Sequence, residues 1–234
     1  MYSPRILIAA PQHQSKDYCF EDWYRNVKLF TYPYIDILLV DNSDGDEYYN
    51  YLSQFDLNVD RIDTTGKSTL EKMEESHNRC RQIALDGKYD YLFHLETDLF
   101  PQFDIIEKLL SAHKKVVGSS YHIYEGAARQ LCVFLLDKDE VVGQLNSINL
   151  PFSISWLGNG LQKVFNTGLG CTLIHKSVLQ KIKFRIVKDI NFPCDAWFGV
   201  DCAINNIDIF NDSNIFVEHK NLGTWSDGEK LIVK

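Results

Sequence analysis

Short apolar segments alternate with helical segments over the first half of the chain, from residue 5 to residue 121. Apolar and β-branched runs predict strands at 5–10, 35–40, 59–63, 91–95 and 116–121. Apolar residues at helical spacing predict helices at 20–30, 46–55, 68–85 and 101–113. Such alternation favours a parallel sheet with helices packed on its faces. We therefore predict an α/β fold with a Rossmann-like, mostly parallel sheet flanked by helices.

The second half of the chain is less regular. Strands are expected at 131–136, 171–174 and 215–218, and a short helix at 177–182. Residues 143–165 are rich in Gly, Asn, Ser and Pro, which is typical of a loop. No segment has the composition of a linker, so we expect a single domain over residues 1–234.

Composition narrows the class of protein. The 234 residues are 45% hydrophobic and 24% charged, which is typical of a soluble globular protein. A net charge of −8 argues against a function that depends on broad electrostatic attraction to nucleic acid. There is no stretch long enough for a membrane span, the N-terminal apolar run is too short for a signal peptide, and the six cysteines are scattered. We expect a cytoplasmic protein with free, buried thiols.

Polar residues follow three of the predicted strands. Gln12 and His13 follow the first, residues 41–43 (Asp-Asn-Ser) follow the second, and residues 96–98 (Glu-Thr-Asp) follow the fourth. Ligands bind at the carboxyl ends of strands in parallel sheets, so a binding site is predicted at this edge.

Glu96 and Asp98 are separated by one residue, and an extended backbone would point both carboxylates to the same side. Two close carboxylates repel each other unless a cation or a proton lies between them. A divalent ion, with water and phosphate oxygens as its other ligands, would satisfy this pair. Capping of the following helix is the alternative explanation, since negative charge is favourable at a helix N-terminus.

Several motifs occur in an order that resembles GT-A glycosyltransferases of the broad family 2 type. They are LIAAPQHQ (7–14), LLVDNSDGD (38–46), the segment 76–101 that contains LETD, FNTGLG (165–170), DAWFGVD (195–201) and IFVEHKN (215–221). The family's D-x-D motif is here Glu-Thr-Asp, which leaves the metal contacts open. The resemblance implies one GT-A-like domain, with a nucleotide-binding half (1–121) and an acceptor-binding and catalytic half (122–234).

The resemblance also implies which residues bind the donor. Pro11 and His13 would lie near the base or the ribose, and Asp41 would accept hydrogen bonds from the uracil or the ribose. Asn78 or Arg79 would face the nucleotide from the helix. An Asx turn that closes the strand is the alternative for Asp41, and a solvated helix position is the alternative for Arg79.

For the metal, the resemblance implies Asp98 as a direct ligand of Mn²⁺ or Mg²⁺ and His219 as the residue that completes the site. Glu96 would contact the ribose or a metal-bound water. Gly168 would allow close approach of the backbone to the donor sugar, although a glycine at a strand entrance is equally typical of a bulge.

Asp195 and Asp201 compete for the position of the catalytic base, and we favour Asp195. Trp197 and Phe198 lie between them, and an aromatic wall beside a carboxylate suits a sugar and raises the pKa of the acid. In the alternative interpretation both rings belong to the core and both aspartates cap helices.

The function that follows is a metal-dependent glycosyltransferase. It would move a sugar from a nucleotide sugar, with a UDP-sugar as the expected donor, to an acceptor hydroxyl, and an aspartate base implies inversion. The acceptor is expected to be soluble: a saccharide, a small molecule, a protein or a modified nucleic-acid base. A nucleotidyltransferase is the first alternative, but the loop after the first strand, PQHQSKDY, lacks the glycines typical of that class. A non-catalytic nucleotide- or sugar-binding module is the second.

Overall fold

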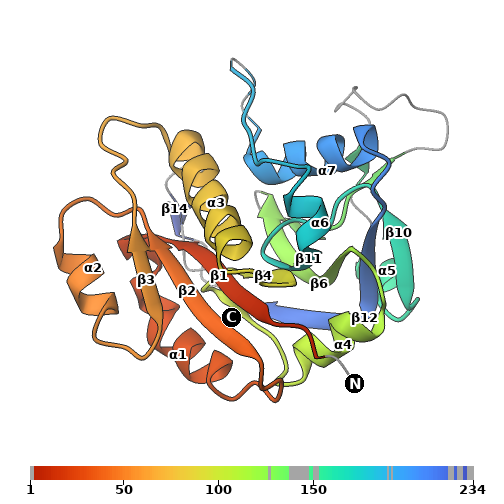
Figure 1. Ribbon diagram of the computed structural model, residues 1–234. Coiled ribbons are helices and arrows are strands. Elements are labelled where there is room, and N and C mark those ends of the chain that lie inside the picture. Colours follow the sequence, from red (N-terminus) through yellow and green to blue (C-terminus); the bar gives the residue numbers. More distant parts are fainter. Residues whose placement is uncertain are drawn as a thin grey trace.

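The computed structural model describes residues 3–125, 128–136, 148–149, 153–188, 190, 192–220, 224–225 and 229–230. Its main feature is a ten-stranded sheet whose central path has the order β10-β12-β6-β11-β4-β1-β2-β3 (Figure 1). Four strands at one end of this path are mutually parallel: β1 (Ile6–Gln12), β2 (Ile35–Asp41), β3 (Asn58–Arg61) and β4 (Tyr91–Leu95).

Strands from the second half of the chain extend the same sheet. β6 (Val116–Glu125) and β12 (Ile209–His219) keep the common direction, whereas β10 (Leu161–Val164) and β11 (Cys171–His175) are antiparallel to their neighbours. Two short strands pair at the side of this path, β5 (Leu99–Phe100) with β12 and β7 (Ala128–Leu131) with β6. Two separate pairs are β8 (Leu135–Leu136) with β9 (Ile148–Asn149), and β13 (Thr224–Trp225) with β14 (Glu229–Lys230). The α/β, mostly parallel architecture is as predicted.

Helices cover both faces of the sheet because the strands are apolar on both sides. In β1, Ile6, Ile8 and Ala10 belong to one core cluster and Leu7 and Ala9 to the other. The first cluster includes α1 (Asp17–Val27), α2 (Glu47–Leu52) and α4 (Ile105–Ser111). The second includes α3 (Thr69–Asp86), α6 (Lys176–Leu179) and α7 (Cys194–Ile204) (Figure 1).

Most predicted elements are present with shifted ends, and α3 begins with the expected capping box. The hydroxyl of Ser68 accepts a hydrogen bond from the Glu71 amide, and the Glu71 carboxylate accepts one from the Ser68 amide. The strand expected at 131–136 is instead divided between β7 and β8. The expected loop 143–165 contains α5 (Ser153–Trp156) and β10, and its residues 143–147 and 150–152 lie outside the described residues.

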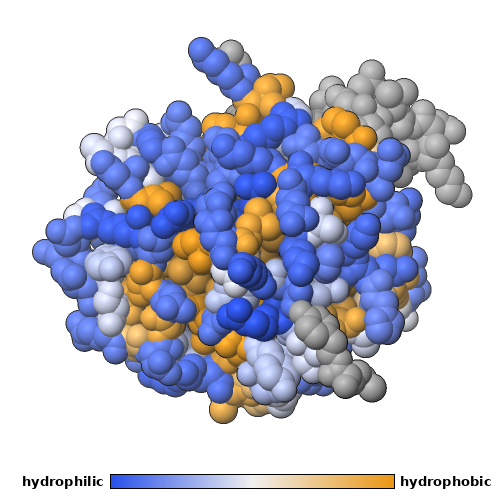
Figure 2. Space-filling model, in the orientation of Figure 1, coloured by the Kyte–Doolittle hydropathy of each residue, from blue (hydrophilic) through white to orange (hydrophobic). Residues whose placement is uncertain are grey.

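All six cysteines are free and buried, as expected. Figure 2 shows a mostly hydrophilic surface with hydrophobic patches on the visible face. Within the described ranges, no helix combines the length and apolar character that crossing a membrane requires.

Candidate functional site

Several strands end at the same edge of the sheet and bring polar residues together. Gln12 at the end of β1 is in register with Asp41 at the end of β2, and β4 ends one residue before Glu96. A pocket of about 480 Å³ lies at this edge. Residues that line it include Pro11, His13, Lys16, Lys72, His77 and Glu96.

A tight turn brings Glu96 and Asp98 together. The Leu99 amide donates to the Glu96 carbonyl (3.1 Å), so this segment is not the extended strand that we expected. Both carboxylates nevertheless converge on one ammonium, since Lys16 Nζ lies 2.9 Å from Glu96 Oε2 and 3.0 Å from Asp98 Oδ2. Capping does not explain the two acids, because the next helix begins only after Asp104.

His219 at the end of β12 faces the same carboxylate. Its Nε2 lies 3.4 Å from Asp98 Oδ2, and its Nδ1 lies 2.7 Å from the His122 carbonyl oxygen. A carbonyl can only accept, so Nδ1 carries a proton and Nε2 is directed at Asp98. Burial lowers the pKa of His219, but Asp98 outweighs this and raises it. Burial of Asp98 would raise its own pKa, but Lys16 and His219 hold that pKa well below its usual value.

The chemistry of these side chains fits a divalent cation. Asp98 Oδ1 is buried and has no hydrogen-bond partner among the described residues, so it is an unused carboxylate ligand. A histidine whose Nδ1–H is fixed by a carbonyl presents Nε2 as metal ligands do. No group of three or more His, Cys, Asp or Glu residues that could hold an ion is found in the described part of the chain. Phosphate or water oxygens would therefore have to complete the coordination.

Asp195 lies in the first turn of α7. The pKa of Asp195 is raised to about 6, mainly by burial and also by the charge of Glu96, although the hydrogen bond from the Ala196 amide opposes the rise. The Asn166 side chain donates to the Asp195 carbonyl (2.6 Å) and fixes the start of the helix. A carboxylate with this pKa is suited to accept a proton near neutral pH.

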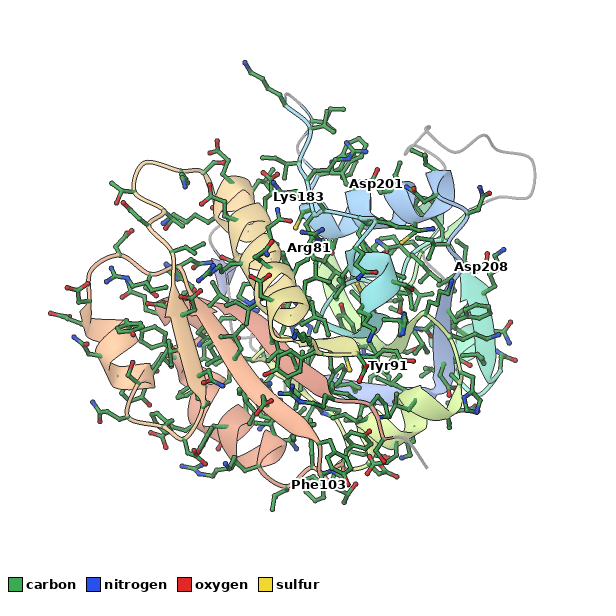
Figure 3. All side chains as sticks on the ribbon, viewed as in Figure 1. Arg81, Tyr91, Phe103, Lys183, Asp201 and Asp208 are labelled. Atoms are coloured by element: carbon green, nitrogen blue, oxygen red, sulfur yellow. The ribbon has the colours of Figure 1, made fainter. Side chains whose placement is uncertain are left out.

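Asp201 lies on the same helix (Figure 3), and its carboxylate is paired with Arg185. Its two oxygens accept from Nε and Nη2 of Arg185, both at 2.8 Å, and the Arg185 guanidinium lies 4.7 Å from the centre of the Trp197 ring. Phe198 is 1% exposed and packs against Phe184 in the core, so it forms no aromatic wall for a sugar. The geometry thus favours Asp195 over Asp201 as the candidate base.

We expect the Asp201→Asn substitution to lower stability without changing turnover. Loss of a paired, partly exposed carboxylate from a bidentate ion pair should cost about 1 kcal/mol. Thermal denaturation and initial rates measure the two effects. A loss of turnover with unchanged stability would instead assign the base role to Asp201.

Among the residues expected to bind the nucleotide, Asp41 forms the Asx turn that was the alternative interpretation. Its Oδ1 accepts from the Ser43 amide (3.0 Å), while Oδ2 is buried without a hydrogen-bond partner in the described chain. The Asx turn does not exclude nucleotide binding, because Oδ2 of Asp41 is still able to accept a hydrogen bond. Pro11 and His13 line the pocket, and burial and Lys72 lower the pKa of His13.

Asn78 and Arg79 have contacts other than those expected. The Asn78 amide group exchanges two hydrogen bonds with the Phe184 backbone, at 2.8 and 3.1 Å. Arg79 forms an ion pair with Asp60 on β3. His77, the residue before Asn78 on α3, does line the pocket, and its Nδ1 lies 2.8 Å from Nε2 of His94 on β4.

Gly168 is required for packing beside this site. Its φ is +63°, and a Cβ there would lie 2.5 Å from both Cys132 Sγ and the Tyr121 hydroxyl. The Tyr121 ring in turn stands edge-on to His219, with 5.9 Å between centroids. Gly168 thus allows the backbone to approach the tyrosine that packs against His219.

Three lysines that line the pocket were not identified from the sequence. Lys16 contacts both acids, Lys67 pairs with Glu75, and Lys72 lies 3.5 Å from Asp44. The available signal was positional: Lys16 follows the first strand, and the other two flank the start of the helix expected at 68–85.

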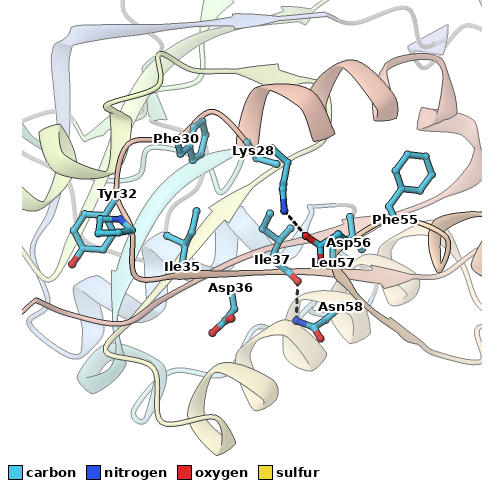
Figure 4. Close-up of a pocket in the computed structure, with 12 residues that line it drawn as sticks. Lys28, Phe30, Tyr32, Ile35, Asp36, Ile37, Phe55, Asp56, Leu57 and Asn58 are labelled. Carbon is cyan, nitrogen blue, oxygen red and sulfur yellow. Dashed lines mark hydrogen bonds and ion pairs between the residues drawn. The ribbon is translucent and has the colours of Figure 1, made fainter.

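A second pocket of about 500 Å³ lies where β2 begins, at the opposite edge of the sheet (Figure 4). Its wall includes Phe30, Tyr32, Phe55 and the Lys28–Asp56 ion pair (2.6 Å). Because carboxyl ends of parallel strands carry ligand sites, this pocket does not belong to the candidate site.

Comparisons with known proteins agree with the fold. No protein-family model matches the chain, and no curated protein matches its sequence. Among solved structures, Staphylococcus aureus TarS 1-349 in complex with UDP-GlcNAc matches 96% of this chain with a TM-score of 0.58 and 10% identity. The mannosyltransferase PcManGT from Pyrobaculum calidifontis, in complex with GDP-Man and Mn²⁺, matches 97% with a TM-score of 0.62 and 12% identity. The chain spans 60% and 59% of these two structures.

Proposed function

We propose that this chain, whose fold is that of GT-A glycosyltransferases, transfers a sugar from a nucleotide sugar to an acceptor hydroxyl. The observation that carries the proposal is the convergence of Asp98, His219 and Glu96 at one sheet edge, beside a pocket, together with the raised-pKa acid Asp195 at the start of α7. Such a set supplies both a cation site for a diphosphate and a base for a hydroxyl.

The nucleotide would bind in the pocket lined by Pro11 and His13, with Asp41 Oδ2 as an acceptor for the base or ribose. A UDP-sugar is our proposed donor. Complexes of the two structural neighbours with UDP-GlcNAc and GDP-Man support a nucleotide sugar as the ligand class.

Asp98 and His219 would hold Mn²⁺ or Mg²⁺, as the unused Asp98 Oδ1 and the orientation of the His219 ring suggest. The bound ion would offset negative charge on the diphosphate leaving group. Asp195 would take the proton from the acceptor hydroxyl as that oxygen attacks the anomeric carbon, with inversion of its configuration.

A thermal-shift screen of UDP-sugars, GDP-sugars and nucleoside triphosphates, each with and without Mn²⁺, tests the proposal. A nucleotide sugar should raise the melting temperature only when Mn²⁺ is present, because a ligand that binds the folded state stabilises it by mass action. Stabilisation by triphosphates alone would indicate a nucleotidyltransferase. Absence of any shift would contradict the proposed donor site.

A further inference from the structure

Lys16 holds the position between the two acids of the candidate site. It ends the short 3₁₀ helix η1 (Gln14–Lys16), directly after β1, and its ammonium contacts Glu96 Oε2 (2.9 Å) and Asp98 Oδ2 (3.0 Å). No residue of the chain was expected there. In the free protein, the Lys16 ammonium is thus the cation that neutralises the two carboxylates.

This ammonium and a divalent ion would compete for the same oxygen. Asp98 Oδ2 faces both Lys16 Nζ and His219 Nε2, and an ion held by Asp98 and His219 would lie beside it. A monovalent and a divalent cation a few ångströms apart repel strongly in a partly buried site. Lys16 would therefore have to leave Asp98 when the ion binds.

The neighbouring pocket offers space into which the Lys16 ammonium can move. Its side chain is 30% exposed and lines the pocket together with His13 and Lys72. A lysine has a flexible four-carbon stem and a compact ammonium, so the head can move by side-chain rotation alone. A nucleoside diphosphate in this pocket would offer phosphate oxygens as the new partner.

We propose that Lys16 exchanges between two partners: the Glu96–Asp98 carboxylates in the free protein, and the donor's diphosphate once a divalent ion has taken Asp98. The proposal rests on the proposed function, because it requires a diphosphate donor. It predicts that the ion and the nucleotide bind cooperatively, each with higher affinity when the other is present.

The test measures binding rather than turnover, with Lys16→Met as the variant. Mn²⁺ affinity is measured by electron paramagnetic resonance without nucleotide, and UDP and GDP affinities by calorimetry at saturating Mn²⁺. Without its competing ammonium, Lys16→Met should bind Mn²⁺ alone about tenfold more tightly than the wild type. It should bind the preferred diphosphate about tenfold more weakly, because a charged phosphate contact is lost.

Two variants serve as controls. Lys28→Met removes a lysine whose ion pair with Asp56 lies at the other edge of the sheet, and it should change neither affinity. Lys16→Arg keeps a positive charge and should bind Mn²⁺ alone no more tightly than the wild type. It also shows whether effects of Lys16→Met come from loss of charge or from a damaged fold.

Unchanged Mn²⁺ affinity in Lys16→Met would overturn the proposal, as would tighter Mn²⁺ binding with unchanged diphosphate affinity. Absence of Mn²⁺ binding in both proteins, even with UDP or GDP, would also overturn it. Failure of the proposed function gives a different result: a wild-type protein that binds Mn²⁺ but neither UDP nor GDP.

Discussion

Replacement of Asp98 by Asn should reduce sugar transfer by about 10³-fold, the scale on which loss of one electrostatic contact at a reacting centre acts. Asp98 is 4% exposed and is the carboxylate that Lys16 and His219 both face. An amide of the same shape keeps the packing but removes the negative charge that would hold a cation at the diphosphate. Initial rates at saturating Mn²⁺ measure the loss.

The matched control is Asp104→Asn, six residues further along the chain. Asp104 is exposed and pairs with Lys108 on the surface of α4, so its loss should leave the rate unchanged. Circular dichroism should show both variants folded. An Asp98→Asn protein with wild-type turnover would show that the reaction needs no cation at this carboxylate.

The pattern of the sequence was sufficient to predict the parallel strands of the first half and the edge of the sheet at which the polar residues gather. β4 has the bounds predicted for it, because Tyr91–Leu95 is a run interrupted only by His94 among apolar residues. Residues after the strands then converge because parallel strands end at one edge. The apolar pattern of a strand is a local property of the sequence, and the position of ligand sites in parallel sheets is a general rule. Neither requires knowledge of side-chain partners.

Contacts between side chains that are distant in the sequence could not be predicted in this way. Lys16 and Glu96 are 80 residues apart, and only the folded chain brings the ammonium to the acids. The turn at Glu96 also depends on tertiary contacts, since the Glu96 amide donates to the Gly170 carbonyl (2.8 Å). We predicted from the alternation of side chains along an extended strand that the two carboxylates would lie on the same side. They do converge, but a turn brings them together rather than an extended backbone.

Helix orientation was the other limit. Successive residues of a helix differ by about 100° in direction, so a choice among His77, Asn78 and Arg79 depends on how α3 rotates on the sheet. The structure turns His77 toward the pocket and Asn78 toward the Phe184 backbone. Likewise, Asp195 and Asp201 could be separated only after Arg185, from the segment before α7, was seen to pair with Asp201.

Replacement of Asp195 by Asn should strongly lower the rate of transfer while leaving donor binding intact. The variant cannot accept a proton, and loss of general base catalysis should lower turnover by about 10²- to 10⁴-fold. UDP affinity at saturating Mn²⁺ should stay within about twofold of the wild type, because the base acts on the acceptor hydroxyl in the transition state and does not contribute to binding of the nucleotide. Calorimetry and initial rates measure the two quantities, and Asp201→Asn on the same helix is the matched control.

The pH dependence gives this assignment a second, independent readout. Only the carboxylate form of Asp195 can act as a base, and its pKa is raised to about 6, mainly by burial. The wild-type rate should therefore fall as pH decreases below about 6 and level off above it, and the residual rate of Asp195→Asn should lack this dependence. A raised aspartate pKa also means that stability is lost as pH rises through that value, since the charged form is disfavoured in the folded state. At pH 8 the Asn variant should consequently melt at the same temperature as the wild type or higher, whereas a purely structural Asp195 would make it melt lower.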